Sequence, residues 1–172
     1  MSFRRNVLVV ANVTAASDEL CEVLTERAAS RPAAFTLVVP ATPFGGGRAA
    51  ALEKVEHAVA RLRDAGLDAE GMVGDSDPVI AVTEAWDPTR YDEIVVSTLP
   101  IGSSKWLHAG LPERIGKITG APVTHVICHP PKPPVEIVHP SHDHKGLLGP
   151  LEVLGWGGPH EEEPQARRGK SG

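Results

Sequence analysis

The sequence predicts an α/β fold, an open, doubly wound parallel sheet of five strands with helices on both faces. Three short apolar runs without polar alternation, at residues 7–10, 35–39 and 94–96, are typical of strands buried on both faces of a parallel sheet. Between them, apolar residues recur every three or four positions, which is the spacing of an amphipathic helix. Strands that alternate with helices indicate βαβ units, and 172 residues suffice for one sizeable core.

The first βαβ unit spans the runs at 7–10 and 35–39. Ser17 is expected to cap the intervening helix, because its hydroxyl can accept a hydrogen bond from an amide of the first turn. Asp18 and Glu19 place negative charge in that turn, where the helix dipole favours it. The inward face of this helix is predicted to consist of Leu20, Val23, Leu24 and Ala28.

The second helix follows a glycine-rich loop at 43–48 and is expected to end at Gly66 in a left-handed conformation. Its inward face is predicted to be Leu52, Val55, Val59 and Leu62. The loop could cradle a phosphate, but it forms neither a dinucleotide fingerprint nor a P-loop, and we favour a plain mobile loop. Residues 67–73 are less apolar and predict a strand at an edge of the sheet.

The third helix is expected to follow Asp77 as N-cap, with Pro78 at the first helical position. Asp75 and Asp77 could form a metal-binding or acid–base pair, but their place before a helix favours turn and capping roles. The residues predicted to face inward are Val79, Ile80, Thr83 and Trp86.

The last part of the predicted domain contains the strand at 94–96, a loop, a helix and a fifth strand at 123–127. This helix is expected to begin near residue 111, with Ile115 and Ile118 facing inward and Gly120 closing it.

Composition excludes some classes of function. A net charge of −5 and the absence of a basic stripe argue against nucleic-acid binding. The apolar run at 7–10 is too short for a signal peptide or a membrane span. Cys21 and Cys128 lie far apart and outside any Cys-x-x-Cys pattern, which favours buried thiols in a reducing compartment. These observations predict a soluble, cytoplasmic protein.

From Pro130 the composition changes, because half of the 16 prolines lie in this last part of the chain. We therefore divide the chain into an α/β domain at 1–129 and a largely irregular tail at 130–172. His129 and the tail histidines His139, His142 and His144 could bind zinc or nickel adventitiously, but a solvated polar segment is favoured and no metal site is predicted.

Residues 147–156 form an apolar island within the tail. Exposed apolar residues invite association, so we expect a short docking segment with Trp156 as its anchor. Its partner could be the chain's own domain, a second subunit or another protein. The alternative is a remnant without a binding role.

The stretch at 97–115 resembles the signature of the universal stress proteins, whose ATP-binding members carry Gly-x-x-Gly, nine residues, and then Gly-Ser or Gly-Thr. Aligning on Gly110 places Ser97 and Pro100 at the first two glycines and Leu111 at the hydroxyl position. Residues 112–115, Pro-Glu-Arg-Ile, resemble the family's Ser-Glu-Arg-Val, and Gly-Asp-Ser-Asp-Pro at 74–78 resembles its Gly-Asp-Pro. The resemblance implies an adenine-nucleotide alpha-hydrolase-like sheet of order 3-2-1-4-5, often dimeric through its last strand.

The resemblance also implies a set of cofactor-binding positions. Asn12 stands where the family's ATP binders have an aspartate near the ribose and adenine, and Val39 falls in the adenine slot. Gly102, Ser103 and Ser104, with Lys105, could form a displaced anion site. The complete set of positions is Ala11, Asn12, Val39, Ser97, Pro100, Gly102, Ser103, Ser104 and Gly110.

The changes at two of the signature positions predict a damaged triphosphate cradle. Pro100 has no N–H, and Leu111 has no hydroxyl. ATP is therefore expected to bind weakly or not at all, and Pro100→Gly with Leu111→Ser to improve its binding. No catalytic residue is predicted, because Asp92, Ser103, Ser104 and His108 lack a Gly-x-Ser-x-Gly elbow.

The function predicted is that of a non-enzymatic, cytoplasmic stress-response or regulatory protein with a lost or altered ATP site. One alternative is an ATP or adenine-nucleotide binder with at most slow ATPase activity. A further alternative is an interaction module that acts through its tail. We also expect a homodimer through the strand at 123–127, which would otherwise be an apolar sheet edge. Residues 135–138 of the tail could cover that edge instead and leave a monomer.

Overall fold

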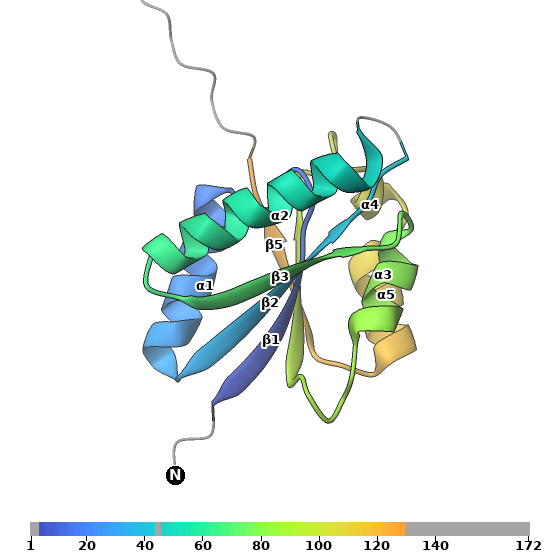
Figure 1. The fold of residues 1–172 in the computed structure, drawn as a ribbon. Helices are drawn as coiled ribbons and strands as arrows, with labels where there is room; N and C mark the ends of the chain where they lie inside the picture. Colours follow the sequence, from blue (N-terminus) through green and yellow to red (C-terminus); the bar gives the residue numbers. More distant parts are fainter. Residues whose placement is uncertain (1–3, 44–45, 130–172) are drawn as a thin grey trace, which may run out of the picture. The chain divides into compact units, whose positions relative to one another are not determined.

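The computed structural model describes residues 4–43 and 46–129, which contain a sheet of five parallel strands (Figure 1). The strand order is β3-β2-β1-β4-β5, which confirms the predicted topology. The strands are β1 (Arg5–Val10), β2 (Ala33–Pro40), β3 (Asp68–Gly74), β4 (Glu93–Thr98) and β5 (Val123–Ile127).

Helices cover both faces of the sheet. They are α1 (Asp18–Ser30), α2 (Gly47–Asp64), α3 (Pro78–Ala85), α4 (Lys105–His108) and α5 (Leu111–Thr119). The helices α1 and α2 lie on one face, and α3 and α5 lie on the other (Figure 1). The short helix α4 was not predicted. It follows Ser104, whose Oγ accepts a hydrogen bond from the Leu107 N–H at 3.3 Å.

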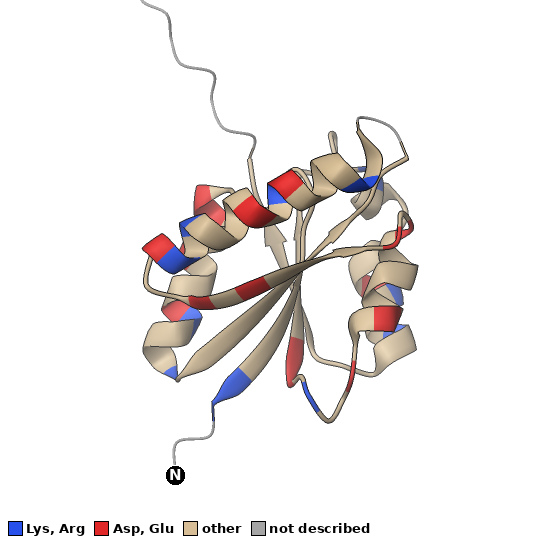
Figure 2. Cartoon of the chain, in the orientation of Figure 1, with Lys and Arg blue, Asp and Glu red and all other residues tan. Residues whose placement is uncertain are grey.

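The two central strands explain the apolar runs in the sequence. Along β1, Val7 and Val9 pack into the core beneath α1 and α2, whereas Leu8 and Val10 pack into the core beneath α3 and α5. All four side chains are fully buried. Charged residues gather on the helices, on β3 and near the amino ends of the strands, and leave the middle of the central strands apolar (Figure 2).

The predicted helix ends are confirmed. The Oγ of Ser17 accepts from the Leu20 N–H at 3.2 Å, and Asp77 accepts from the Val79 N–H at 2.7 Å. Gly66 and Gly120 both have positive φ values, of +83° and +66°, and follow the last turns of α2 and α5. Asp75 accepts from the Asp77 N–H at 2.8 Å, so both aspartates have the turn and capping roles favoured from the sequence.

The predicted inward faces of three helices are partly wrong. Leu52, Ile80 and Ile118 are 49%, 46% and 53% exposed, and Thr83 is exposed as well. Small neighbours are buried in their place, namely Ala51 and Ala58 on α2 and Ala81 on α3. These small residues let the helix backbones approach the sheet closely. At Gly74, for example, an added Cβ would lie 2.6 Å from the Cβ of Ala81.

The turn before β4 is organised by Asp87. The Thr89 hydroxyl and amide donate to its Oδ1 at 2.7 and 2.8 Å, and these bonds lower the pKa of Asp87 below its ordinary value.

We expect Thr89→Val to raise the pKa of Asp87 toward that ordinary value, because the hydroxyl donor is lost while the amide remains. A carboxylate whose pKa is lowered by folding adds stability above its unfolded pKa, and this contribution disappears as the pH falls through the folded pKa. Carbon-detected NMR titration of the Asp87 carboxyl group measures the shift directly. An unchanged titration curve in the variant would contradict the assignment of the hydroxyl as the main cause.

Several sequence-based predictions concern residues outside the described ranges. These are the tail histidines beyond His129, the strand at 135–138 and the docking segment with Trp156. The boundary between residues 129 and 130 also stays a prediction. Within the described residues, Cys128 is fully buried and Cys21 is half-buried, and both are free thiols. None of the helices described is long and apolar enough to cross a membrane.

Candidate functional site

A cleft opens where the carboxyl ends of β1 and β4 lie side by side. The chain winds outward from β1 in one direction and from β4 in the other, so the loops that follow these two strands diverge. Such a switch point is where open α/β sheets bind ligands. The cavity has a volume of about 250 Å³ and is lined by Asn12, Val13, Thr14, Thr42, Ser97, Thr98, Leu99, Ser103, Ser104, Lys105 and Trp106.

The floor of the cleft is a buried hydrogen-bonded cluster. The Ser97 hydroxyl donates to the Oγ1 of Thr14 at 2.7 Å and lies 3.1 Å from the Sγ of Cys128. Thr14 in turn donates to the Ser97 carbonyl at 3.2 Å. Both hydroxyl residues are at most 2% exposed. Ser97, which aligns with the first signature glycine, therefore places a packed side chain where glycine would leave backbone accessible.

The loop after β4 closes on its own backbone. The carbonyl of Pro100 accepts from the amides of Ser103 and Ser104, at 2.8 and 3.0 Å. These two amides belong to the displaced anion site predicted for residues 102–105, and both are occupied. The Oγ of Ser104 also caps α4. The loop still offers the Lys105 ammonium group and the serine hydroxyl protons to an anion.

The last two signature positions belong to the start of α5. Gly110 is left-handed, with a φ of +62°, and its N–H donates to the Leu107 carbonyl at 3.0 Å. Leu111 is only 1% exposed and packs with Ile115 in the core beneath α3 and α5. Its side chain is thus part of the core and is not presented to the cleft.

Asn12 borders the cleft from the end of β1. Its Oδ1 accepts a hydrogen bond from the Nζ of Lys54, on α2, at 3.0 Å. The side-chain amide therefore faces the cleft mainly as a donor. Beside it lies a smaller cavity of about 90 Å³ that is lined by Lys54 and His57.

The structure brings four of the nine predicted cofactor-binding residues to the cavity, which are Asn12, Ser97, Ser103 and Ser104. Ala11 and Val39 lie fully buried in the core. Pro100 and Gly102 belong to the adjoining loop and Gly110 to the start of α5, and none of the three lines the cavity. Lining residues that were not predicted are Val13, Thr14, Thr42, Thr98, Leu99 and Trp106. Val13, Thr14 and Leu99 follow the ends of β1 or β4, so the switch-point rule could have found these three.

No protein-family profile matches the sequence, and no curated protein matches it either. Solved structures do match the fold. A universal stress protein in complex with cAMP is 19% identical, with a TM-score of 0.50, and the match covers 72% of this chain and 97% of that one. The universal stress protein from Archaeoglobus fulgidus in complex with dAMP is 18% identical, with a TM-score of 0.53 and coverages of 73% and 99%. A second structure from Archaeoglobus fulgidus is 17% identical, with a TM-score of 0.52 and coverages of 71% and 93%. This chain therefore has the fold of the universal stress proteins, to which the stretch at 97–115 pointed.

Proposed function

We propose that this protein is a cytoplasmic regulatory protein of the universal stress protein type, which binds a small ligand in the switch-point cleft and does not hydrolyse ATP. One observation carries the proposal. Two amides of the displaced anion site predicted after β4 are already bonded within the loop, because Ser103 and Ser104 both donate to the Pro100 carbonyl.

The charge of the cleft supports the same conclusion. Lys105 is the one charged residue among the described residues that line it. A triphosphate needs several charge-assisted hydrogen bonds, each contributing about 1.5–3 kcal/mol, and about 1.4 kcal/mol corresponds to a tenfold change in affinity. Loss of two such donors is therefore expected to weaken ATP binding by at least two orders of magnitude.

The size of the cleft favours a ligand smaller than ATP. Its volume of about 250 Å³ lies below the range of roughly 300–1,000 Å³ that is usual for small-molecule sites. Trp106, Leu99 and Val13 offer apolar surface to a planar ring, and Lys105 offers a partner for one phosphate. The similar proteins in complex with cAMP and dAMP hold nucleotides with a single phosphate. Adenine mononucleotides are therefore the class to test first.

Isothermal titration calorimetry of the full chain with Mg-ATP, AMP and cAMP tests this proposal. We expect no binding of Mg-ATP at micromolar concentration and no release of phosphate from it. Lys105→Ala should weaken the binding of a mononucleotide, whereas Lys117→Ala, on the exposed side of α5, should not. Micromolar binding of Mg-ATP, or its hydrolysis, would instead favour the alternative of an ATP-binding protein with slow ATPase activity.

A second copy of the chain is the partner that we propose for β5. Among the described residues this strand pairs with β4 alone, so its outer edge offers unpaired backbone groups. Ile127 is 49% exposed on this strand, and Val126 beside it is buried. Proteins usually cover such an edge, and a homodimer would do so.

We expect static light scattering at micromolar concentration to give the mass of a dimer for the natural chain and of a monomer for Ile127→Lys. A lysine on an edge strand opposes strand pairing because its charge must stay hydrated. Ile118→Lys is a matched control, since Ile118 is similarly exposed but lies on α5. A monomeric mass for the natural chain would remove the dimer proposal.

A further inference from the structure

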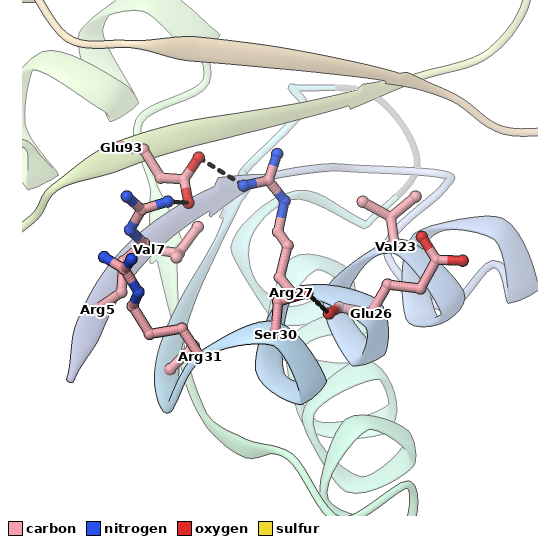
Figure 3. Close-up of a pocket in the computed structure, with 9 residues that line it drawn as sticks. Arg5, Val7, Val23, Glu26, Arg27, Ser30, Arg31 and Glu93 are labelled. Atoms are coloured by element: carbon pink, nitrogen blue, oxygen red, sulfur yellow. Dashed lines mark hydrogen bonds and ion pairs between the residues drawn. The ribbon is translucent and has the colours of Figure 1, made fainter. Parts of the chain in front are cut away.

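A second and larger cavity lies at the opposite ends of the strands, beside the amino ends of β1 and β4 (Figure 3). Its volume is about 460 Å³. Three arginines line it from two elements, Arg5 from β1 and Arg27 and Arg31 from α1 and its C-terminal end. The cavity shares no lining residue with the switch-point cleft, so its chemistry is independent of the function proposed for that cleft.

The inner wall of the cavity holds one buried carboxylate. The Glu93 side chain is 8% exposed, and its Oε2 lies 2.6 Å from the Nη1 of Arg27. Its Oε1 lies 3.4 Å from the Nη1 of Arg5. The Nη2 of Arg27 also donates to the Oγ1 of Thr124 at 2.7 Å. Glu93 therefore fixes two guanidinium groups, although its single charge balances only one of them.

The third guanidinium group adds to this imbalance. Arg31 is exposed, and its side chain has no hydrogen bond or ion pair with the described residues. The carboxylate of Glu26 is the other acidic group at the cavity, and it points away from the three guanidinium groups (Figure 3). Furthermore, the Nε of Arg27 is buried without a hydrogen-bond partner among the described residues. The cavity thus has a surplus of positive charge, and the Arg31 guanidinium group supplies N–H donors that have no partner among the described residues.

The dipole of α1 accounts for part of this arrangement. Its C-terminal end carries about half a negative charge, which favours Arg27 and Arg31 in or just after the last turn. Arg5 comes from β1 and gains no such support from its own strand. Even with the dipole included, three positive charges face one buried carboxylate and a partial charge.

We propose that this cavity binds a phosphate-type oxyanion, either inorganic phosphate or the phosphate group of a small metabolite, between the guanidinium groups of Arg5 and Arg31. A guanidinium group binds phosphate through two parallel N–H donors, which a point charge such as that of lysine does not offer. Glu93 holds Arg5 and Arg27 at the wall of the cavity, and its negative charge limits how tightly an anion can bind there.

Titration of the full chain with inorganic phosphate at constant ionic strength tests the proposal, followed by NMR of the arginine Nε–H groups. We expect saturable shifts at Arg5 and Arg31. Arg31→Gln should raise the dissociation constant roughly tenfold or more, the effect of losing one charge-assisted contact. Arg114→Gln removes the same charge from an exposed site on α5 and should change nothing. Glu93→Gln should lower the dissociation constant, because it removes a repelling charge.

Three results would overturn the proposal. The first is NMR shifts that do not saturate at millimolar phosphate. The second is an equal loss of phosphate affinity in Arg31→Gln and Arg114→Gln. The third is loss of phosphate binding in Lys105→Ala but not in Arg31→Gln, which would place the anion in the cleft. If Glu93→Gln does not fold, the comparison of Arg31→Gln with Arg114→Gln still tests whether the cavity binds the anion. A parallel titration with glucose 6-phosphate distinguishes a metabolite phosphate from inorganic phosphate as the natural ligand. Tighter binding of glucose 6-phosphate than of inorganic phosphate indicates a metabolite, and equal binding indicates the free ion.

Discussion

Leu111→Ser will lower the free energy of unfolding by about 3–5 kcal/mol, because a leucine truncated in a core leaves a cavity and the new hydroxyl would be buried beside apolar side chains. Leu111 is 1% exposed and lies in the core beneath α3 and α5. Urea denaturation of the natural chain and the variant measures the difference.

Ile118→Ser on the same helix is the matched control, because Ile118 is 53% exposed. Ile118→Ser should lower the free energy of unfolding by less than about 1 kcal/mol, as is usual for surface substitutions. Similar losses in the two variants would contradict the placement of Leu111. The result also bears on function, since the sequence suggested that Leu111→Ser with Pro100→Gly would improve ATP binding. The structure predicts a destabilised protein instead. Pro100→Gly alone is therefore the better variant for testing whether the loop after β4 limits ATP binding.

Arg27→Met will lower the free energy of unfolding by about 3 kcal/mol, at the lower end of the range for breaking a buried ion pair. The Glu93 carboxylate would stay buried and keep only the longer contact to Arg5, at 3.4 Å. Thr124 would also lose its donor. Thermal or urea unfolding at neutral pH measures this change.

Two further variants separate the ion pair from simple loss of a long side chain. Combining Arg27→Met with Glu93→Leu should restore most of the lost stability, because no charge is then left buried without a partner. Arg4→Met breaks an ion pair with Asp68 in which both side chains are at least half exposed, and should cost no more than about 1 kcal/mol. If the double variant is as unstable as Arg27→Met, the buried charge is not the cause.

The sequence predicted the strands and the helix caps because each of these has a local signal, whereas the strand order came from the resemblance to the universal stress proteins. Ser17 and Asp77 stand directly before the helices they cap, and the runs at 7–10 and 94–96 are apolar on both faces. The inward faces were harder to predict. Leu52 and Ile80 are more apolar than Ala51 and Ala81, but it is the alanines that are buried. Close approach of a helix to the sheet depends on small residues, and which residues face the sheet is decided by tertiary packing.

The candidate site was predictable in place but not in chemistry. Asn12, Ser103 and Ser104 follow the two central strands, where ligands of such folds bind. That the Pro100 carbonyl occupies two serine amides depends on the turn that the loop adopts, and its residues do not specify this turn. The arginine cavity escaped prediction for another reason. Arg27 and Glu93 are 66 positions apart in sequence, and only the folded sheet brings them together.

The buried floor of the cleft has a kinetic consequence. Cys128 has no exposed surface and lies beneath Ser97, so a thiol reagent can reach it only when the floor opens. Cys21 is half-buried and does not need this opening. Alkylation should therefore proceed in two phases, and the slow phase measures how often the floor opens. A ligand that closes the cleft would slow that phase without changing the fast one. The alkylation rate of Cys128 would therefore report how much of the cleft is occupied by ligand.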